Sequence, residues 1–512
     1  MDDDATRLRR LLPHASVATI VAAVACLGLF TGSASAVCWS SRLVIAPKSH
    51  ASSLSSLVAT ANGRSVGILT KDVGRDPSVP AGSFSTRDLY QASAYRFRAR
   101  SLDIVERSRL AAPNVYNGQG QAVDDASGDI VTVWNSRTGW LWSRLRAGSS
   151  AWSPARAVPT FAGERSADWK LVARPDGSVM LIWETLSEDS GWWWLRASSL
   201  APGATRWGGP TPVSKIPNGG PSNDPLFVEQ LPSGGLRVVW GHADLRRWVQ
   251  LPAGSVPAWR DESSQLEAAH GLRLTAGADG TLVAIWDRSR VDGSADGARR
   301  PRASVYVAVR HAGEPAFSKP QQLTPNAPGI AGAASVTIGV NGAATLFAST
   351  SATPAQVVVD SARHTMTAGA AEWTRSAAKV KLGTRTYRLL PGSTTFTPIA
   401  HGLQSEPFAF VPLTDGTTLA FISVGYGLSA RLEAARGIPG SARWASATPL
   451  GTPGVASDSL VAIPTPDGGA LIAWSRETPN PNPRVYTWQT SVLAGRFTQA
   501  GPCRSWGLAR RH

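Results

Sequence analysis

The sequence predicts an all-β protein that folds as a β-propeller of seven or eight four-stranded blades. Its clearest signal is a repeated phrase in which a glycine is followed six residues later by a tryptophan. Repeats spaced by tens of residues indicate a stacked or ring-shaped architecture. The residues inside each copy are mostly strand formers and helical periodicity is almost absent, which favours a propeller over a β-sandwich array or a solenoid. The five copies are Gly128 to Trp134, Gly177 to Trp183, Gly234 to Trp240, Gly280 to Trp286 and Gly468 to Trp474.

One repeat shows how a blade is built. Residues 168–174 read as a first strand, and Pro175-Asp-Gly177 has the composition of a tight hairpin turn. Residues 178–183 form a second strand that is apolar on both faces, as expected of a strand between packed sheets. Residues 192–198 read as the third strand. Residues 207–213 read as the outer strand, where proline suits an edge position because no ladder donor is lost.

The same turn can be placed eight times. Three copies lack the tryptophan and hold Leu69, Ala348 and Ile422 instead, so we interpret the tryptophan position as a packing position. The copy at Gly63 is weak, which leaves seven and eight blades both open. The pivots are Asn62-Gly63, Ser127-Gly128, Asp176-Gly177, Gly234-Gly235, Asp279-Gly280, Asn341-Gly342, Asp415-Gly416 and Asp467-Gly468.

The N-terminal 36 residues have the pattern of a secretory signal peptide. Three arginines precede a 14-residue apolar stretch that is too short for a membrane span, and Ala34-Ser-Ala36 fits a cleavage site. We expect cleavage after Ala36 and a secreted, extracellular protein without a membrane span. The alternative is a lipoprotein signal with lipid attached at Cys26.

The rest of the chain divides into three parts. Residues 37–56 form an N-terminal segment with a possible ring-closing strand, residues 57–503 form the propeller, and residues 504–512 form a basic C-terminal tail. Cys38 and Cys503 lie at the two ends of the mature chain, and an even pair in an exported protein predicts a disulfide that joins the termini. The alternatives are two free thiols or an intermolecular bond.

The chain is strongly basic, with a formal net charge of +15, and arginine supplies most of the positive charge. An exported basic protein can bind acidic glycans or wall polymers. The competing interpretation is arginine spread evenly over the surface, because no dense basic run occurs. Nothing in the sequence indicates a specific nucleic-acid partner.

Several stretches resemble a known group of propellers. Pro175-Asp-Gly177 with its apolar strand, and residues 305–320, resemble the blades of secreted sialidase-like repeat propellers from actinobacteria, and the turn before Leu419-Ala-Phe421 is similar to TolB-type repeats. The resemblance covers most of residues 57–500 and implies blade architecture. The sialidase Asp-box and the Arg-Ile-Pro segment are absent, so no catalytic residue is carried over and no activity follows.

Catalytic and metal-binding motifs are scarce. A glycosidase needs two carboxylates at a set separation, and the weak candidates are Glu184 and Asp287, each directly after a motif tryptophan. Equivalent positions vary among the copies, as solvent-exposed loop residues also would. The histidines lack metal-ligand spacing, and the acidic loop at residues 292–297 lacks the glutamate that ends a calcium loop. We therefore predict no metal and no cofactor.

Tryptophan is abundant, with 20 residues, and several lie outside the repeat position. Such aromatics either stack on sugar rings or anchor a protein partner, and the alternative is packing between blades. The predicted function is thus a binding module for a carbohydrate, a cell-wall polymer or a protein. The alternatives are a glycoside hydrolase or lyase with acids on the propeller rim, and a scaffold in a surface assembly. The ligand-binding candidates are Trp140, Trp142, Trp192, Trp193, Trp194, Trp248, Arg196 and Arg246.

Overall fold

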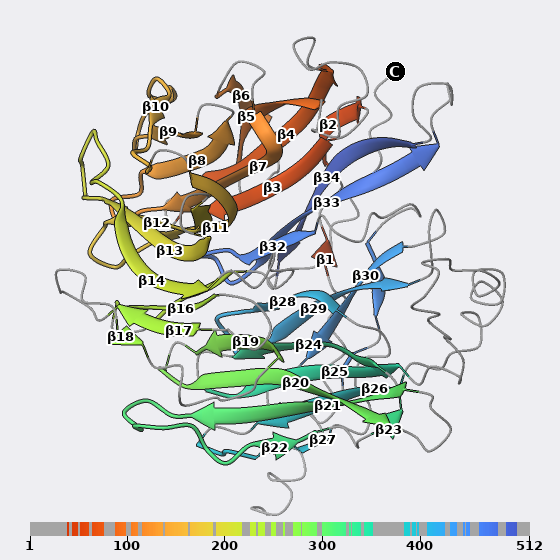
Figure 1. Ribbon diagram of the computed structural model, residues 1–512. Coiled ribbons are helices and arrows are strands. Elements are labelled where there is room, and N and C mark those ends of the chain that lie inside the picture. The colour runs from red at the N-terminus through yellow and green to blue at the C-terminus, as the bar shows by residue number, and fades with distance from the viewer. Residues whose placement is uncertain are drawn as a thin grey trace, which may run out of the picture. The chain divides into compact units, whose positions relative to one another are not determined.

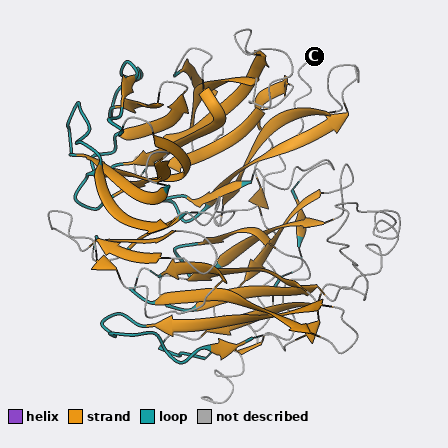
Figure 2. Ribbon diagram, viewed as in Figure 1, coloured by secondary structure: helices purple, strands orange, loops and turns teal. Residues whose placement is uncertain are grey.

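The fold is seen in a computed structural model in which the described residues form strands, turns and loops, with no helix among them (Figure 2). Apart from Cys38, they all belong to one compact unit, Trp39–Thr498. The structure describes residues 38–39, 43–49, 52–60, 64–75, 88–98, 104–110, 115–136, 139–161, 164–187, 191–217, 226–231, 234–240, 247–251, 260–261, 270–277, 279–293, 299–323, 327–328, 330–338, 342–351, 383–389, 392–395, 397–398, 407–424, 431–437, 444–445, 447–450, 460–479 and 488–498.

Strands follow one another in groups of four along the chain (Figure 1). The first four groups are β3 (Ser52–Ala59), β4 (Arg64–Arg75), β5 (Asp88–Arg98) and β6 (Ile104–Arg109); β7 (Val115–Asp124), β8 (Ile130–Ser136), β9 (Gly139–Leu145) and β10 (Arg156–Ala157); β11 (Glu164–Ala173), β12 (Val179–Ser187), β13 (Trp192–Leu200) and β14 (Thr211–Pro217); and β15 (Phe227–Gln230), β16 (Leu236–Trp240), β17 (Arg247–Leu251) and β18 (Arg260–Asp261).

The second half of the chain continues the pattern. Its strands are β19 (His270–Ala276), β20 (Leu282–Gly293), β21 (Arg299–Arg310), β22 (Gln321–Gln322) and the short β23 (Ala327–Pro328); β24 (Ile330–Ile338), β25 (Ala344–Ser351), β26 (Gly383–Leu389) and β27 (Thr397–Pro398); β28 (Pro407–Pro412), β29 (Thr418–Val424), β30 (Arg431–Gly437) and β31 (Thr448–Pro449); and β32 (Val461–Pro464), β33 (Ala470–Pro479) and β34 (Trp488–Thr498), with β1 (Cys38–Trp39) and β2 (Leu43–Ser49) at the N-terminal end.

These strands form seven antiparallel sheets, which are the blades of a β-propeller. One sheet has eight strands because β5 and β7 pair at Tyr90 and Val115, which joins the first two groups of four. Seven sheets therefore carry eight copies of the repeat unit, one blade being double. The predicted all-β propeller is confirmed.

The ring closes through the first strand of each unit and through apolar clusters between sheets. β3 contacts β7, the contacts continue through β11, β15, β19, β24, β28 and β32, and β32 contacts β3 again. At the closing point Leu57 and Phe97 share a buried cluster with Leu471 and Val492. The core thus lies between sheets, which explains second strands that are apolar on both faces.

The N-terminal strand β2 lies in the same sheet as β34, with Val44 opposite Leu493. A strand from the start of the chain therefore pairs with one from its end, a device that removes an exposed edge. Cys503 and the side chain of Cys38 lie outside the described residues, so the terminal disulfide stays a prediction. The signal peptide and the C-terminal tail also lie outside them.

The tryptophan of the repeated phrase packs between sheets. Trp183 is only 1% exposed and shares a cluster with Val131 and Val133 of the preceding unit. Trp240 packs in the same way on Ile182, and its indole N–H has no hydrogen-bond partner among the described residues. The substitutes Leu69, Ala348 and Ile422 are buried as well. The interpretation of this position as a packing position is confirmed.

The turn of the phrase follows a fixed geometry. Gly177 has a φ of 80° and donates its N–H to the carbonyl of Arg174, while Arg174 N–H bonds the carbonyl of Ser178. This is a type I turn closed by a left-handed glycine, the three-residue hairpin loop. Asp176 accepts hydrogen bonds from the N–H and hydroxyl of Ser178, at 2.9 and 2.6 Å. The turns at Asp279 and Asp415 repeat this carboxylate contact with a threonine.

Candidate functional site: an arginine groove between two blades

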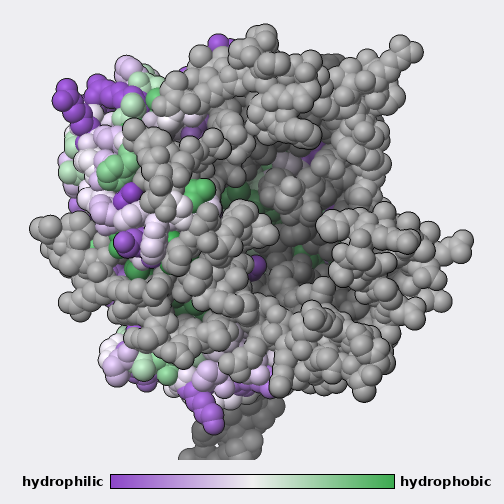
Figure 3. All heavy atoms as spheres, in the orientation of Figure 1, coloured by the Kyte–Doolittle hydropathy of each residue, from purple (hydrophilic) through white to green (hydrophobic). Residues whose placement is uncertain are grey.

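Two adjoining hollows lie beside the outer strands of the second and third units. They have volumes of about 240 and 440 Å³ and share Trp142, Arg156 and Thr205. The described surface around β9, β10 and the loop before β14 is largely hydrophilic (Figure 3). We call the two hollows together the arginine groove, and its main lining residues are Trp142, Arg144, Arg146, Trp152, Arg156, Thr205, Arg206 and Trp207.

The loop between β9 and β10 sets the position of one wall. Gly148 takes a φ of 82°, and Ser149 N–H donates to the Arg146 carbonyl at 3.0 Å, which closes a turn. Ser153 N–H then returns to the carbonyl of Arg144 at 2.8 Å, and the Ser153 hydroxyl accepts from Arg144 N–H at 3.0 Å. The loop is thus tied at both ends, and it holds Arg144 and Arg146 at the edge of the groove.

Arg144 occupies a position that five units share. It lies opposite Val131, three residues after the turn glycine, and Arg96, Arg388, Arg436 and Arg496 lie at the equivalent register positions. Arg436 and Arg496 pair with the aspartates of their own turns. In these two units the arginine of the third strand stabilises the hairpin turn through an ion pair.

In the second unit Ser127 occupies the position of these aspartates, and Arg144 instead faces Asp129, two residues later. Arg144 is 5% exposed, yet its Nε is 3.8 Å from Asp129 and has no hydrogen-bond partner. The other oxygen of Asp129 accepts the N–H of Ala147 at 2.7 Å, so the loop uses part of this carboxylate. A buried guanidinium that is only partly neutralised attracts an anion strongly.

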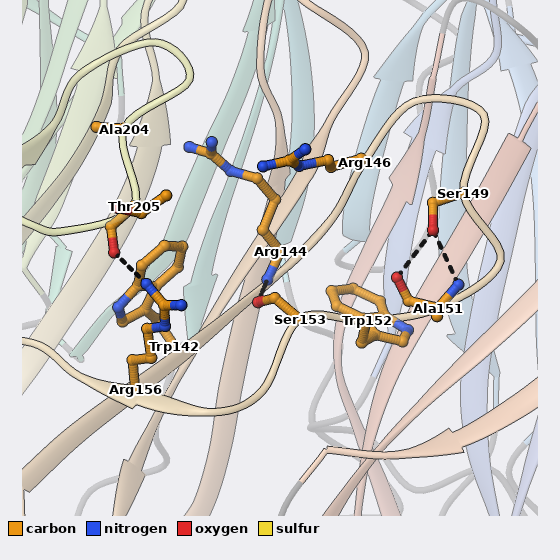
Figure 4. A pocket seen from close by; sticks show the side chains of 10 residues that line it. All are labelled: Trp142, Arg144, Arg146, Ser149, Ala151, Trp152, Ser153, Arg156, Ala204 and Thr205. Atoms are coloured by element: carbon orange, nitrogen blue, oxygen red, sulfur yellow. Dashed lines mark hydrogen bonds between the residues drawn. The ribbon is translucent and has the colours of Figure 1, made fainter.

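Three further arginines add to this charge. Figure 4 shows the guanidinium ends of Arg144 and Arg146 lying near each other, while Arg156 lies beside Trp142 and donates to the Thr205 carbonyl at 2.8 Å. The side chains of Arg146 and Arg206 form no ion pair within the described part of the chain. No aspartate or glutamate is among the described residues that line the groove. Several arginines around a hollow that no described carboxylate lines make a site for an anion.

Aromatic side chains form the floor between the arginines. Trp142 is 3% exposed and meets Trp207 edge to face, with ring centroids 6.3 Å apart. The indole N–H of Trp207 is buried and has no partner among the described residues. Trp152 is half-buried at the other end. The groove therefore offers rigid apolar walls together with charged donors, a combination typical of binding sites.

The other predicted tryptophans divide between core and surface. Trp140 is buried against Trp169, with ring centroids 4.6 Å apart, and Trp193 is buried in the cluster that faces the fourth unit. Trp192 and Trp194 lie on the opposite face of β13 and are half-buried, as alternation along a strand requires. Arg196 lies on that same face, 8% exposed. Trp140 and Trp193 are thus core residues.

Of the remaining candidates, only Glu184 has a side chain within the described residues. Glu184 is 2% exposed within β12, opposite Leu195, so its carboxylate does not lie on an open rim. Asp287 lies in β20 opposite Val305, and its side chain is outside the described set. The side chain of Trp248, in β17, and the whole of Arg246 also lie outside the described residues. Glu184 and Asp287 as a catalytic pair therefore stay a prediction.

The described residues contain neither a candidate metal site nor a candidate membrane-spanning helix. Within the described residues, no three His, Cys, Asp or Glu side chains are grouped as a metal site would require. None of these residues forms a helix with the length and hydrophobicity that crossing a membrane requires.

Comparisons with known proteins find only distant structural similarity. No family model and no curated protein matches the chain. A solved protein of unknown function from Dyadobacter fermentans is 13% identical over 90% of this chain and 98% of its own, with a TM-score of 0.39. The polysaccharide lyase Uly1 is 8% identical over 87% and 90%, with a TM-score of 0.41. An α-L-arabinofuranosidase from Fusarium graminearum is 14% identical over 74% and 92%, with a TM-score of 0.34. Likeness this distant carries no activity over to this chain, and the resemblance to sialidase-like propellers stays a prediction.

Sequence reasoning identified Trp142 but did not find Arg146, Arg156 and Arg206, three of the arginines around it. The available signal was the arginine that recurs late in the third strand of five units, in register with the turn. Arg146, Arg156 and Arg206 carry no repeat signal, because they lie in loops and an outer strand that differ between units. Only the packing of two neighbouring blades brings them together.

Proposed function

We propose that this protein is a binding module for an anionic polymer, an acidic glycan or cell-wall polymer, which it holds in the arginine groove. The observation that carries the proposal is the convergence of Arg144, Arg146, Arg156 and Arg206 around buried tryptophan rings, with no acid among the described lining residues. Guanidinium groups donate in pairs to carboxylate, sulfate or phosphate oxygens, and the apolar walls exclude water from those contacts.

The net charge supports the same function at longer range. A chain with a formal charge of +15 draws anionic ligands from solution and favours polymers over single ions. The predicted export would bring the protein to such polymers. Glu184 does not support the hydrolase or lyase alternative, because its side chain is buried and does not lie on an accessible rim.

The test is direct binding of purified protein to heparin, used as a sulfated and carboxylated probe, at low and high salt. We expect binding that weakens steeply with salt, because counterions are released from the polyanion. Arg146→Ala should lower the affinity about five-fold or more and flatten the salt dependence. Arg273→Ala, the loss of an exposed arginine in β19 outside the groove, is the matched control.

Two results would overturn the proposal. One is the absence of binding to heparin, polyphosphate and an acidic plant or bacterial polysaccharide at low salt. The other is equal weakening by Arg146→Ala and Arg273→Ala, which would assign binding to diffuse charge. Selective binding of an acidic protein, with no binding to these polymers, would favour the protein-partner alternative.

A further inference from the structure

A row of alternating aromatic and cationic side chains runs along the outer part of the third unit, on β13, β14 and the segment before β11. The Lys215 ammonium lies over the rings of Trp192 and Trp194, at 4.8 and 5.5 Å from their centroids. We call this row the aromatic–cation ladder, and its members are Trp192, Trp194, Arg196, Lys215 and Phe161.

The strand register explains the row. Trp194 lies opposite Lys215 in the β13–β14 ladder, and Trp192 and Arg196 are two residues away on the same face. The Arg196 guanidinium is held between two rings, 4.3 Å from the centroid of Trp194 and 4.3 Å from that of Phe161. Each cation is thus positioned by a ring face.

The ladder keeps its charge and part of its apolar surface available. Lys215 is exposed and forms no ion pair within the described residues. Phe161 is 38% exposed, and it is one of three large hydrophobic residues in the described part that are this open. Ring faces together with the exposed Lys215 ammonium match a ligand that presents both C–H surfaces and anionic groups, which is the chemistry of an acidic polysaccharide.

The ladder also continues from the arginine groove. Pro159 lines the groove and Phe161 follows two residues later. At the other side, β13 begins with Trp192 and leads into the loop that supplies Thr205 and Arg206 to the groove. The nine residues of β13 span about 25 Å, so a short ligand in the groove would not reach Trp192.

We propose that the ladder is a second subsite for the same ligand and that this ligand is a linear acidic polysaccharide whose sugar rings pack on Trp192, Trp194 and Phe161 while its anionic groups pair with Lys215. This inference rests on the proposed function, since it extends the ligand of the arginine groove. It predicts that affinity depends on chain length and on the presence of rings, in addition to charge.

The experiment compares a heparin tetrasaccharide, a heparin dodecasaccharide and a polyphosphate of matching length and charge. The variants are Trp192→Ala, Trp192→Phe, Lys215→Ala and Arg146→Ala, with Lys319→Ala as the control for loss of an exposed lysine. We expect Trp192→Ala to weaken dodecasaccharide binding about five- to ten-fold and to leave tetrasaccharide and polyphosphate binding unchanged. Trp192→Phe should restore most of the loss. Lys215→Ala should weaken both long ligands and Lys319→Ala neither.

The outcomes separate the two proposals. If the wild-type protein binds none of the probes, the proposed function fails. If it binds them and Arg146→Ala weakens binding while Trp192→Ala and Lys215→Ala leave the dodecasaccharide affinity unchanged, the groove stands and the ladder is overturned. Equal weakening of polyphosphate and dodecasaccharide by Trp192→Ala would overturn ring packing. A thermal melt of each variant shows whether it is folded, and Lys215→Ala tests the ladder by itself if Trp192→Ala unfolds the protein.

Discussion

Arg144 Nε lies 3.8 Å from the Asp129 carboxylate, and Asp129 follows its turn glycine, whereas the aspartates that pair with Arg436 and Arg496 precede theirs. Arg436 approaches Asp415 to 3.6 Å, and Arg496 forms a direct hydrogen bond with Asp467. In the second unit the carboxylate also accepts the N–H of Ala147 from the loop that borders the arginine groove. The guanidinium of Arg144 is buried and has only this long contact with a carboxylate, so it is partly available to an anionic ligand.

Asp129→Asn tests this relationship. The amide oxygen can still accept the N–H of Ala147, so the loop should keep its position, while the negative charge beside Arg144 disappears. We expect the affinity for heparin to rise several-fold and the free energy of unfolding to fall by no more than about 1 kcal/mol. Isothermal titration and urea unfolding measure the two effects. Unchanged heparin affinity in a folded Asp129→Asn protein would show that Arg144 takes no part in binding.

Asp467→Asn should destabilise the last blade in a pH-dependent way. Burial raises the pKa of Asp467, but the hydroxyl of Thr465 and the charge of Arg496 outweigh it, so this pKa lies below the usual value. Arg496 is 2% exposed, and loss of its partner should cost about 1 to 2 kcal/mol at neutral pH, a value reduced because Asp467 itself is 42% exposed.

The sign of the pH effect follows from that lowered pKa. A carboxylate with a depressed pKa in the folded state stabilises the fold above its unfolded pKa of about 4 and loses this effect as the pH falls through the folded value. Wild type and Asp467→Asn should therefore differ at neutral pH and converge as the pH falls below the lowered pKa of Asp467. Urea midpoints across this range measure the difference. Lys319→Ala, which removes an exposed positive charge outside the last blade, is the control and should change stability little.

The ring could be predicted from the sequence because its signals are periodic, whereas the groove could not. The turn glycine recurs in all eight units and the buried tryptophan in five of them, since the same position packs between sheets in each unit. The loop at residues 146–155 and the outer strands differ between units, and their neighbours are set only when sheets pack. Trp140, Trp142 and Trp193 were equivalent in the sequence; the structure buries all three, and of these only Trp142 also lines the groove.

Gly177→Ala should destabilise the third unit through its backbone. Gly177 has a φ of 80°, and an added Cβ would meet the ring of Pro202 at 3.3 Å. The left-handed conformation costs a residue with a Cβ about 1 to 2 kcal/mol, and the contact adds to it. Urea unfolding should show this loss. Gly203→Ala is a matched control for strain alone, because its φ is 70° and nothing lies within 4 Å of an added Cβ. A smaller loss for Gly177→Ala than for Gly203→Ala would contradict the packing contribution.

Trp183 tests the interpretation of the repeated phrase as a packing device. Its ring is 1% exposed between the second and third units, in the cluster that also contains Trp142. Trp183→Ala should lower the free energy of unfolding by about 3 to 5 kcal/mol, because it removes a large buried side chain and leaves a cavity. Trp183→Leu should cost less, since Leu69 fills the equivalent position in the first unit. If Trp183→Leu leaves the stability unchanged but abolishes heparin binding, the packing interpretation is contradicted. Trp183 would then have a direct role in the ligand site.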